Sequence, residues 1–302
     1  MVADFELIVT TKAGRLDKYI SEHSDLSRSR VQELLASGDI LVNGKQEKAS
    51  YKVANNDQIT VHVPKLVPLN VEPEDIPLDI VYEDEDVIVV NKPQGMVVHP
   101  SAGHPNHTLV NALMNHTKEL AASPEGFRPG IVHRIDKDTS GLLMIAKNAH
   151  ARTSLESQLA HKTNKRVYLA IVHGNFKEAT GTIDAPIARN PKDRKKMAVV
   201  EGGKEAVTHF RVLEQYPGYA LVSCQLETGR THQIRVHMKY IGHPLAGDPL
   251  YGPKKTLKGH GQFLHAKILG FKQPKTGQWL EFQVNPPEIF QKKLTYLRSL
   301  KG

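Results

Sequence analysis

The sequence predicts an α+β protein in which a small helix-and-hairpin unit precedes a larger unit built on a mixed or antiparallel sheet. Three observations support this fold class. Prolines cluster between residues 64 and 78, strand patterns outnumber helix patterns after residue 79, and the order of elements shows no repeated βαβ unit. The chain has 302 residues, of which 39% are hydrophobic and 24% charged, which is enough for one sizeable domain and a small one.

The first unit, residues 14–63, begins with the patterns of two short helices. Leu16 and Ile20 share one face of the first helix, at the four-residue spacing of an amphipathic segment. Ser27 is a suitable N-cap for the second helix. Gly38 is expected to end that helix, because glycine readily adopts the left-handed conformation found after many helices.

The same unit continues with a hairpin and a further strand. Ile40 to Val42 is a strand pattern, and Asn43-Gly44 is a strong signal for a tight hairpin turn. Ile59 to Val63 alternates between apolar and polar residues, as a half-buried strand does. The four prolines of residues 64–78 cannot continue a helix or a central strand, so we expect an extended linker there.

Residues 79–302 form the second expected unit, in which strand patterns predominate. We expect strands at 79–82, 87–90, 166–173, 205–214, 219–227, 263–271 and 279–284. We expect helices at 108–116, 149–161, 231–241 and 287–299. Their irregular order favours a mixed or antiparallel sheet.

Charge and composition narrow the classes of partner. The net charge of +8 favours polyanions such as nucleic acid. No apolar run is long enough to span a membrane, and the N-terminus lacks a signal pattern, so we expect a cytoplasmic protein without a membrane partner. No sequence feature decides the oligomeric state, for which we expect a monomer. The single cysteine, Cys224, cannot form an internal disulfide. No metal-ligand or nucleotide-binding glycine motif is present, so we expect chemistry from ordinary side chains, without metal or cofactor.

A charged segment, Gly130–Gly141, lies between two apolar, strand-like runs. Burying an unpaired charge costs on the order of several kcal/mol, so Asp136 is expected to line a cleft. Arg230 and Arg235 lie near the start of a predicted helix, where the positive end of the helix dipole suits an anion or a carboxylate. Tyr168 is the tyrosine of a nearby predicted strand.

These motifs resemble, in sequence order, the signature of the RluA family of RNA pseudouridine synthases. Arg189–Val199 and Ala206–His209 are similar to its large-subunit rRNA synthase D type (RluD). Ile135 stands where the family usually has leucine, which is a volume-conserving exchange. The segments that carry the resemblance are His133-Arg134-Ile135-Asp136 with Thr139-Ser140-Gly141, Asn91-Lys92-Pro93 through His99-Pro100, the Tyr168 strand and Thr228-Gly229-Arg230.

The resemblance implies isomerisation of uridine in RNA: the N1–C1′ bond breaks, the uracil turns, and C5 bonds to C1′, without a cofactor. It implies Asp136, Tyr168 and Arg230 as catalytic residues, with Arg230 as the ion-pair partner of Asp136. Tyr168 would place its ring against the uracil and its phenol near the C5 proton. Arg134 would fill the gap that the target base leaves in the stack. The other side chains expected to contact substrate here are His133, Thr139 and Arg235.

The first unit resembles the S4 RNA-binding domain, through Arg15-Leu16-Asp17, Ser27-Arg28-Ser29-Arg30 and Gly38 to Gly44. Arg28 and Arg30 lie at a helix start, which already favours phosphate, and Lys45 can add charge on the same face. A second basic cluster is either a solvated loop or a contact with the RNA backbone. It consists of Lys192, Arg194, Lys195 and Lys196.

We expect large-subunit (23S) rRNA as the substrate. The sequence leaves two alternatives: a synthase that acts on tRNA by the same chemistry, and a non-catalytic RNA-binding factor of ribosome assembly that keeps the enzyme fold. It also leaves open whether Asp136 attacks the sugar, adds to the base, or acts through a glycal.

Overall fold

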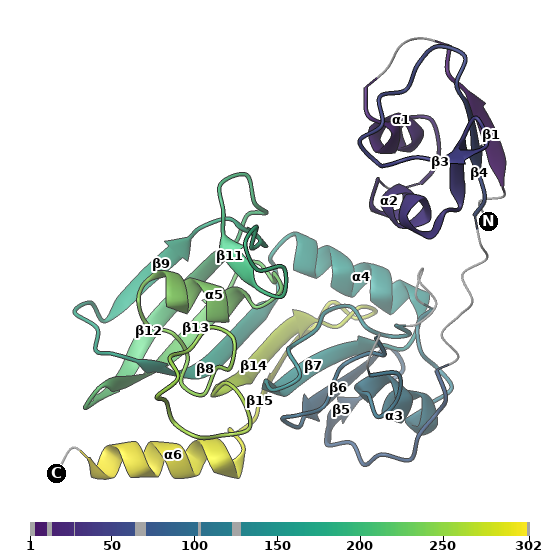
Figure 1. Ribbon diagram of the computed structural model, residues 1–302. Coiled ribbons are helices and arrows are strands. Elements are labelled where there is room, and N and C mark those ends of the chain that lie inside the picture. Colours follow the sequence, from purple (N-terminus) through teal and green to yellow (C-terminus); the bar gives the residue numbers. More distant parts are fainter. Residues whose placement is uncertain are drawn as a thin grey trace. The chain divides into compact units, whose positions relative to one another are not determined.

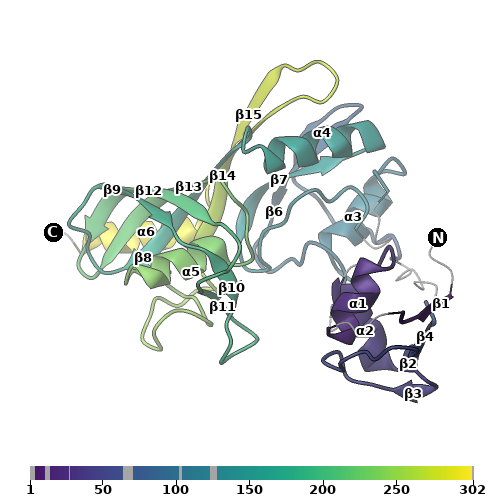
Figure 2. The ribbon, with the colours of Figure 1, turned by 90° about the horizontal axis from the view of Figure 1, so that it is seen from above.

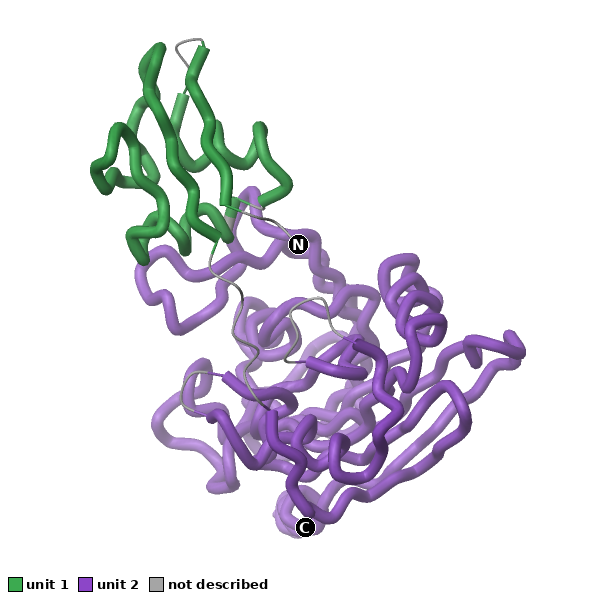
Figure 3. The backbone as a smooth tube through the Cα atoms, turned by 90° about the vertical axis from the view of Figure 1, so that its right-hand side faces the viewer, with its two compact units in different colours: residues 1–67 green, residues 68–302 purple. Residues whose placement is uncertain are grey.

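The structure is a computed structural model, which describes residues 4–10, 14–26, 28–63, 71–101, 104–122 and 128–300. The chain divides into two compact units, Met1–Val67 (unit 1) and Pro68–Gly302 (unit 2), coloured separately in Figure 3. The fold class is α+β, as predicted. None of the helices in the described ranges is long and apolar enough to cross a membrane.

Unit 1 packs two helices against an antiparallel sheet of strand order β1-β4-β2-β3. Gly38 has a φ of 85° and ends the second helix, and Asn43 and Gly44 turn the hairpin with φ values of 52° and 75°. The predicted N-cap, Ser27, lies outside the described residues. The elements are β1 (Phe5–Ile8), α1 (Leu16–Glu22), α2 (Arg28–Ser37), β2 (Ile40–Val42), β3 (Lys45–Gln46) and β4 (Gln58–Val61).

In unit 2, nine strands of the described residues form one sheet, of order β5-β6-β7-β14-β8-β13-β12-β9, with β15 beside β14. The strands are β5 (Ile80–Glu83), β6 (Val87–Lys92), β7 (Ser140–Ala146), β8 (Lys165–His173), β9 (Thr180–Asp184), β12 (Val207–Tyr216), β13 (Tyr219–Leu226), β14 (Leu264–Lys272) and β15 (Trp279–Gln283). A separate hairpin consists of β10 (Ile187–Arg189) and β11 (Met197–Val199). The helices are α3 (Leu109–His116), α4 (Ala149–Ala160), α5 (Gln233–Tyr240) and α6 (Glu288–Ser299).

Helices cover both faces of this sheet (Figures 1 and 2). On one face, α3 and α5 share a core with alternate residues of β8, including Tyr168 and Ala170. On the other face, α6 packs against the intervening residues Leu169 and Ile171, and α4 packs against β7 and β14. The period-two alternation along β8 therefore places Tyr168 on the same face as α5.

The strand direction in the sheet changes from antiparallel to parallel pairing where β7 meets β14. These two strands pair in parallel through only two residue pairs, His265↔Ser140 and Ala266↔Gly141, whereas their other partners are antiparallel. Gly141 has a φ of 110°, and a Cβ atom there would overlap the backbone of Ala266. Only glycine can adopt this positive φ readily and also leave room for the backbone of Ala266, because it has no Cβ atom. This close contact fixes the start of β7, directly after the segment that contains Asp136.

The strands and helices predicted for unit 2 are present, to within two residues at each end. Four strands described in unit 2 were not predicted as strands: β7, which the sequence indicated only as an apolar, strand-like run after the charged segment, and β9, β10 and β11. β10 and β11 are three residues long each, too short to show alternation, and β9 is a polar edge strand with one buried residue. In unit 1, β1 precedes the expected first unit and pairs with β4. Residues 71–78 of the expected linker belong to unit 2, where Val71 joins the core.

Replacement of Gly141 by alanine is expected to destabilise unit 2 by about 3 kcal/mol, because both the backbone conformation and the overlap with Ala266 oppose a Cβ atom. Thermal or urea unfolding measures this loss. Gly202→Ala is the matched control: Gly202 has a φ of 74° but no atom within 4 Å of an added Cβ, so a loss of about 1 kcal/mol is expected. Equal losses in the two variants would contradict the packing argument.

Candidate active site

A pocket of about 520 Å³ lies in unit 2, where the loop before β7 meets β8 and the start of α5. The structure brings together every residue of unit 2 for which the sequence predicted a catalytic or substrate-binding role. They are His133, Arg134, Asp136, Thr139, Tyr168, Arg230 and Arg235.

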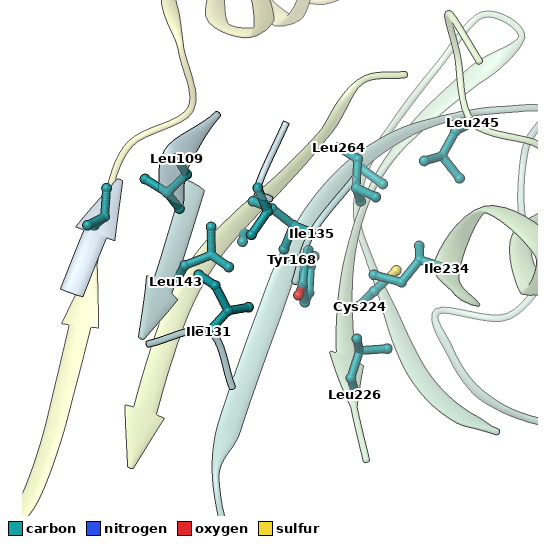
Figure 4. Packing of buried hydrophobic residues seen from close by; sticks show 14 of the residues in the cluster. Leu109, Ile131, Ile135, Leu143, Tyr168, Cys224, Leu226, Ile234, Leu245 and Leu264 are labelled. Atoms are coloured by element: carbon teal, nitrogen blue, oxygen red, sulfur yellow. The ribbon is translucent and has the colours of Figure 1, made fainter. Parts of the chain in front are cut away.

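Asp136 faces the pocket because its neighbour is buried. Ile135 is 8% exposed and lies in the core beside the ring of Tyr168 (Figure 4). Lys92 holds the loop on the other side: its Nζ donates hydrogen bonds to the carbonyl oxygens of Pro93, Met96 and Lys137 at 2.7, 2.8 and 3.0 Å. Burial lowers the pKa of Lys92 to about 7, and the three carbonyls supply acceptors that this amine would otherwise lack.

The ion-pair partner of Asp136 is Arg235, and the prediction of Arg230 for this role was wrong. Arg235 Nη1 donates to Asp136 Oδ2 at 2.8 Å. Its Nε and Nη2 donate to the two carboxylate oxygens of Asp248 at 2.7 and 2.9 Å. Burial lowers the pKa of Arg235, but the hydrogen bonds and negative charges of Asp248 and Asp136 together outweigh this effect. The net result is a pKa above the ordinary value for arginine. One guanidinium thus joins a fully buried carboxylate to one whose side chain is 21% exposed.

Arg230 lines the same pocket but is held elsewhere. Its Nε donates to the carbonyl oxygen of Glu205 at 2.8 Å, and its backbone N–H donates to Gln233 Oε1 at 2.9 Å. Gln233 is buried and also accepts a hydrogen bond from Thr228 Oγ1, at 2.8 Å. The first residue of α5 therefore holds the Thr228-Gly229-Arg230 turn against the start of the helix.

Sequence reasoning missed Asp248 because nothing in the local pattern connects it with Arg235, thirteen residues earlier. It also exchanged the roles of two arginines that follow one turn. Arg230 is in the turn itself, whereas Arg235 is the third residue of α5 and points back to the loop. Arg235 is 4% exposed. Its position among the apolar residues of the predicted helix was the one signal in the sequence that it would be buried and would need an acidic partner.

Tyr168 lies at the back of the pocket and is 6% exposed. Burial raises the pKa of Tyr168, with Arg166 acting in the opposite direction. The free protein therefore presents a neutral phenol and an aromatic ring. Cys224 is buried in the adjacent strand, where burial raises the pKa of its thiol to about 12, so it is an inert packing residue.

His133 and Thr139, for which substrate contacts were predicted, line the pocket and also hold the loop. His133 Nε2 accepts a hydrogen bond from the backbone N–H of Met144 at 3.1 Å. Burial, together with the charge of Arg166, lowers the pKa of His133 to about 3, which keeps it a neutral acceptor. Thr139 is 1% exposed, and its Oγ1 accepts from Gln262 Nε2 at 3.1 Å. Arg134, in contrast, is exposed at the pocket.

The basic residues predicted to contact RNA in unit 1 have different surroundings. Arg28 Nε is 3.0 Å from the buried carboxylate of Asp17, which Arg15 also contacts at 2.9 Å. Hydrogen bonds from Arg15 first, and then from Arg28 and Gln32, lower the pKa of Asp17. The Arg28 side chain is still 50% exposed. On α2, Arg30 pairs with Glu33, and on β3, Lys45 is exposed.

The predicted basic cluster in unit 2 forms the tip of the β10–β11 hairpin. The side chain of Asn190 accepts hydrogen bonds from the backbone N–H groups of Lys192 and Asp193, and Arg189 donates to the carbonyl of Arg194. The tip is thus an ordered turn. Lys192, Arg194 and Lys195 are exposed on it, while Lys196 pairs with Asp193.

Comparison with known proteins agrees with this architecture. A family model described as RNA pseudouridylate synthase matches residues 86–240, and the S4 domain model matches residues 14–59. The chain belongs to the RNA pseudouridylate synthase family. It is therefore an RNA pseudouridine synthase, an isomerase, with an S4 domain in unit 1.

Individual relatives cover most of the chain. The uncharacterised RNA pseudouridine synthase YlyB of Bacillus subtilis is 56% identical over 95% of both chains. Ribosomal large subunit pseudouridine synthase D of Neisseria meningitidis is 46% identical over 96% of this chain and 80% of its own. The solved structure of human RNA Pseudouridylate Synthase Domain Containing 1 is 26% identical, with a TM-score of 0.58 over 76% of this chain and 96% of that protein.

In the described ranges, no three His, Cys, Asp or Glu side chains are grouped to hold a metal ion. The side chains that meet in the pocket instead provide an oriented carboxylate, an aromatic ring and several guanidinium groups. Such a set can bind a nucleotide and its phosphates and can present a carboxylate to it.

We expect Arg235→Lys to lower kcat about 100-fold, because lysine cannot contact both carboxylates and a displacement of about 1 Å in a catalytic group has effects of that size. Single-turnover formation of pseudouridine measures the change. Arg230→Lys serves as the paired variant, with an expected loss of less than about tenfold, since Arg230 does not pair with Asp136. A larger loss in Arg230→Lys than in Arg235→Lys would contradict the assignment.

Proposed function

We propose that this enzyme converts specific uridines of large-subunit (23S) rRNA to pseudouridine in the cytoplasm, with Asp136 as the residue that reacts with the target nucleotide. The observation that carries the catalytic part is the Asp136 carboxylate, held by Arg235 at 2.8 Å on the floor of an arginine-rich pocket. The rRNA substrate is supported by the large-subunit synthases D among the relatives, which are 43–46% identical over most of the chain.

The pocket suits a nucleotide that has left its stack. The ring of Tyr168 offers a flat surface for the uracil, and the partly exposed carboxylate of Asp136 lies near it. In the overall reaction the N1–C1′ bond breaks, the uracil turns, C5 bonds to C1′, and the proton from C5 is replaced by one on N1. No external reactant is consumed, so the protein needs to orient the base and to hold the charge of Asp136.

Residues at the rim complete the proposed role. Arg134 is exposed beside Asp136 and is long and planar enough to occupy the position that the extruded base vacates. Arg230 lies where a flanking phosphate would pass, which is a binding role instead of the ion-pair role first expected. In unit 1, the exposed cations Arg28 and Lys45 would contact the RNA backbone.

Asp136→Asn is expected to lower pseudouridine formation by at least about 10³-fold while RNA affinity changes less than about threefold, because the amide cannot take over the role of the carboxylate. Activity is measured on purified protein, and filter binding reports affinity. A thermal melt verifies that the variant is folded. We expect it to fold because Asp248 keeps the Arg235 guanidinium paired. Substantial activity in Asp136→Asn would refute the assigned role.

The substrate is tested by mapping pseudouridine in total RNA of cells that have or lack the protein. Sites in 23S rRNA are expected to disappear without it, to return with the wild-type gene, and to stay absent with Asp136→Asn. If the missing sites lie in tRNA instead, the rRNA proposal is wrong although the enzyme class stands.

The β10–β11 hairpin is expected to contribute to RNA binding through charge. Lys192→Ala with Lys195→Ala should lower the slope of log affinity against log salt concentration by about 1.5, since each released phosphate contact contributes about 0.7 to 0.9. Lys292→Ala with Lys293→Ala on α6 is a control that removes the same charge from another face. Identical slopes in the two double variants would exclude the hairpin as a specific contact.

A further inference from the structure

A chain of polar groups leads from the β10–β11 hairpin to Asp136. The backbone N–H of Met197, the first residue of β11, donates to the hydroxyl of Tyr251 at 2.8 Å. The same hydroxyl is 2.8 Å from Nδ1 of His232. On the opposite side of that ring, Nε2 of His232 is 3.8 Å from Asp136 Oδ1. The sequence predicted no role for either His232 or Tyr251.

The hydrogen-bond donors in this chain favour one of the two positions for the histidine proton. Tyr251 is 5% exposed, and its oxygen accepts a hydrogen bond from Met197, so its own proton is directed to Nδ1 of His232. A neutral imidazole that accepts at Nδ1 carries its proton on Nε2. That N–H faces Asp136 Oδ1, the oxygen opposite the one that Arg235 binds.

Ionisation in the surroundings is consistent with these roles. Burial lowers the pKa of His232, with the charge of Asp136 acting in the opposite direction, so the ring is neutral at physiological pH. Burial raises the pKa of Tyr251, so its hydroxyl keeps the proton that it donates. The Tyr251 ring also lies against the centre of the Arg235 guanidinium, at 5.1 Å, and therefore contacts both residues that flank Asp136.

The backbone of His232 supports a specific placement of this ring. Its φ of 58° is left-handed, a conformation that few non-glycine residues adopt, although histidine adopts it more often than most of them. This conformation directly precedes α5 and turns the imidazole toward Asp136, while Gln233 starts the helix. Backbone conformations of this kind occur preferentially where function requires a fixed geometry.

We propose that His232 is a positioning residue for the reaction, held by Tyr251 against the β10–β11 hairpin so that its Nε2–H supports Oδ1 of Asp136. This inference rests on the proposed role of Asp136. At 3.8 Å the contact is longer than a hydrogen bond in the free enzyme. A shift of about 1 Å when RNA fills the pocket completes it, after which both carboxylate oxygens have a donor and the carboxylate plane is fixed. The hairpin that meets the RNA backbone is thereby connected to the reacting carboxylate.

Replacement of His232 by asparagine or by glutamine tests its two ring nitrogens separately. The side-chain oxygen of asparagine can take the place of Nδ1 and accept the hydrogen bond from the Tyr251 hydroxyl, so His232→Asn keeps the contact with Tyr251 but loses the donor to Asp136. The amide nitrogen of glutamine reaches the place of Nε2, so His232→Gln keeps that donor but loses the contact with Tyr251. Asparagine tolerates the left-handed backbone better than glutamine does, so a merely structural role predicts that His232→Gln is the more damaged variant.

The experiment measures single-turnover rates and RNA affinities of the full chain, on the RNA that the wild type modifies. His232→Asn is expected to lower kcat about tenfold or more with KM and affinity nearly unchanged, and His232→Gln to retain most of the rate. Tyr251→Phe keeps the ring over Arg235 and is expected to lower kcat to a similar extent, with no additional loss when combined with His232→Asn. Losses that follow thermal stability, or a His232→Gln rate at or below that of His232→Asn, overturn the proposal.

Asp136→Asn measured in parallel keeps this inference distinct from the proposed function. If Asp136→Asn remains active, the assigned role of Asp136 fails and this inference fails with it. If Asp136→Asn is inactive and all His232 and Tyr251 variants match the wild type, only the inference about His232 is wrong.

Discussion

The guanidinium of Arg235 lies between two carboxylates, and the geometry of the pocket depends on it. Isolated charges of either sign are costly to bury, whereas a bidentate pair with additional hydrogen bonds offsets much of that cost. Asp248 provides this pair and is itself held by the backbone N–H groups of Leu250 and Tyr251. Two carboxylates share one guanidinium, so the excess negative charge remains on Asp136, the most exposed of the three groups.

This arrangement requires a rigid frame on the other side of Asp136. The loop is anchored at one end by Ile135 in the core and at the other by the contact of Gly141 with Ala266. Lys92 binds the carbonyl of Lys137 between these anchors. A charged segment can therefore lie between apolar strands because Asp136 is paired with Arg235 and faces the pocket, and the carbonyl of Lys137 is bound by Lys92.

Cations in the chain serve two distinct purposes. In unit 1, Arg15 and Arg28 enclose the buried carboxylate of Asp17, which links α1 to the start of α2 and leaves each guanidinium half exposed. In unit 2, the tip of the β10–β11 hairpin presents Lys192, Arg194 and Lys195 as exposed cations on an ordered turn, while Asp193 pairs with Lys196. The first group combines stability with a basic surface, and the second is suited mainly to contact with a polyanion.

The sequence alone determined the fold class, most strands and helices, the residues that meet in the pocket and the reaction family. Periodicity, turn signals and an ordered set of motifs are local properties of a chain, and all of these conclusions depend on them. The partner of Asp136 was decided by tertiary structure, because Arg230 and Arg235 are five residues apart and only the direction of α5 selects between them. The same holds for Asp248, His232 and Tyr251, which are brought to one carboxylate by packing between segments that share no sequence pattern.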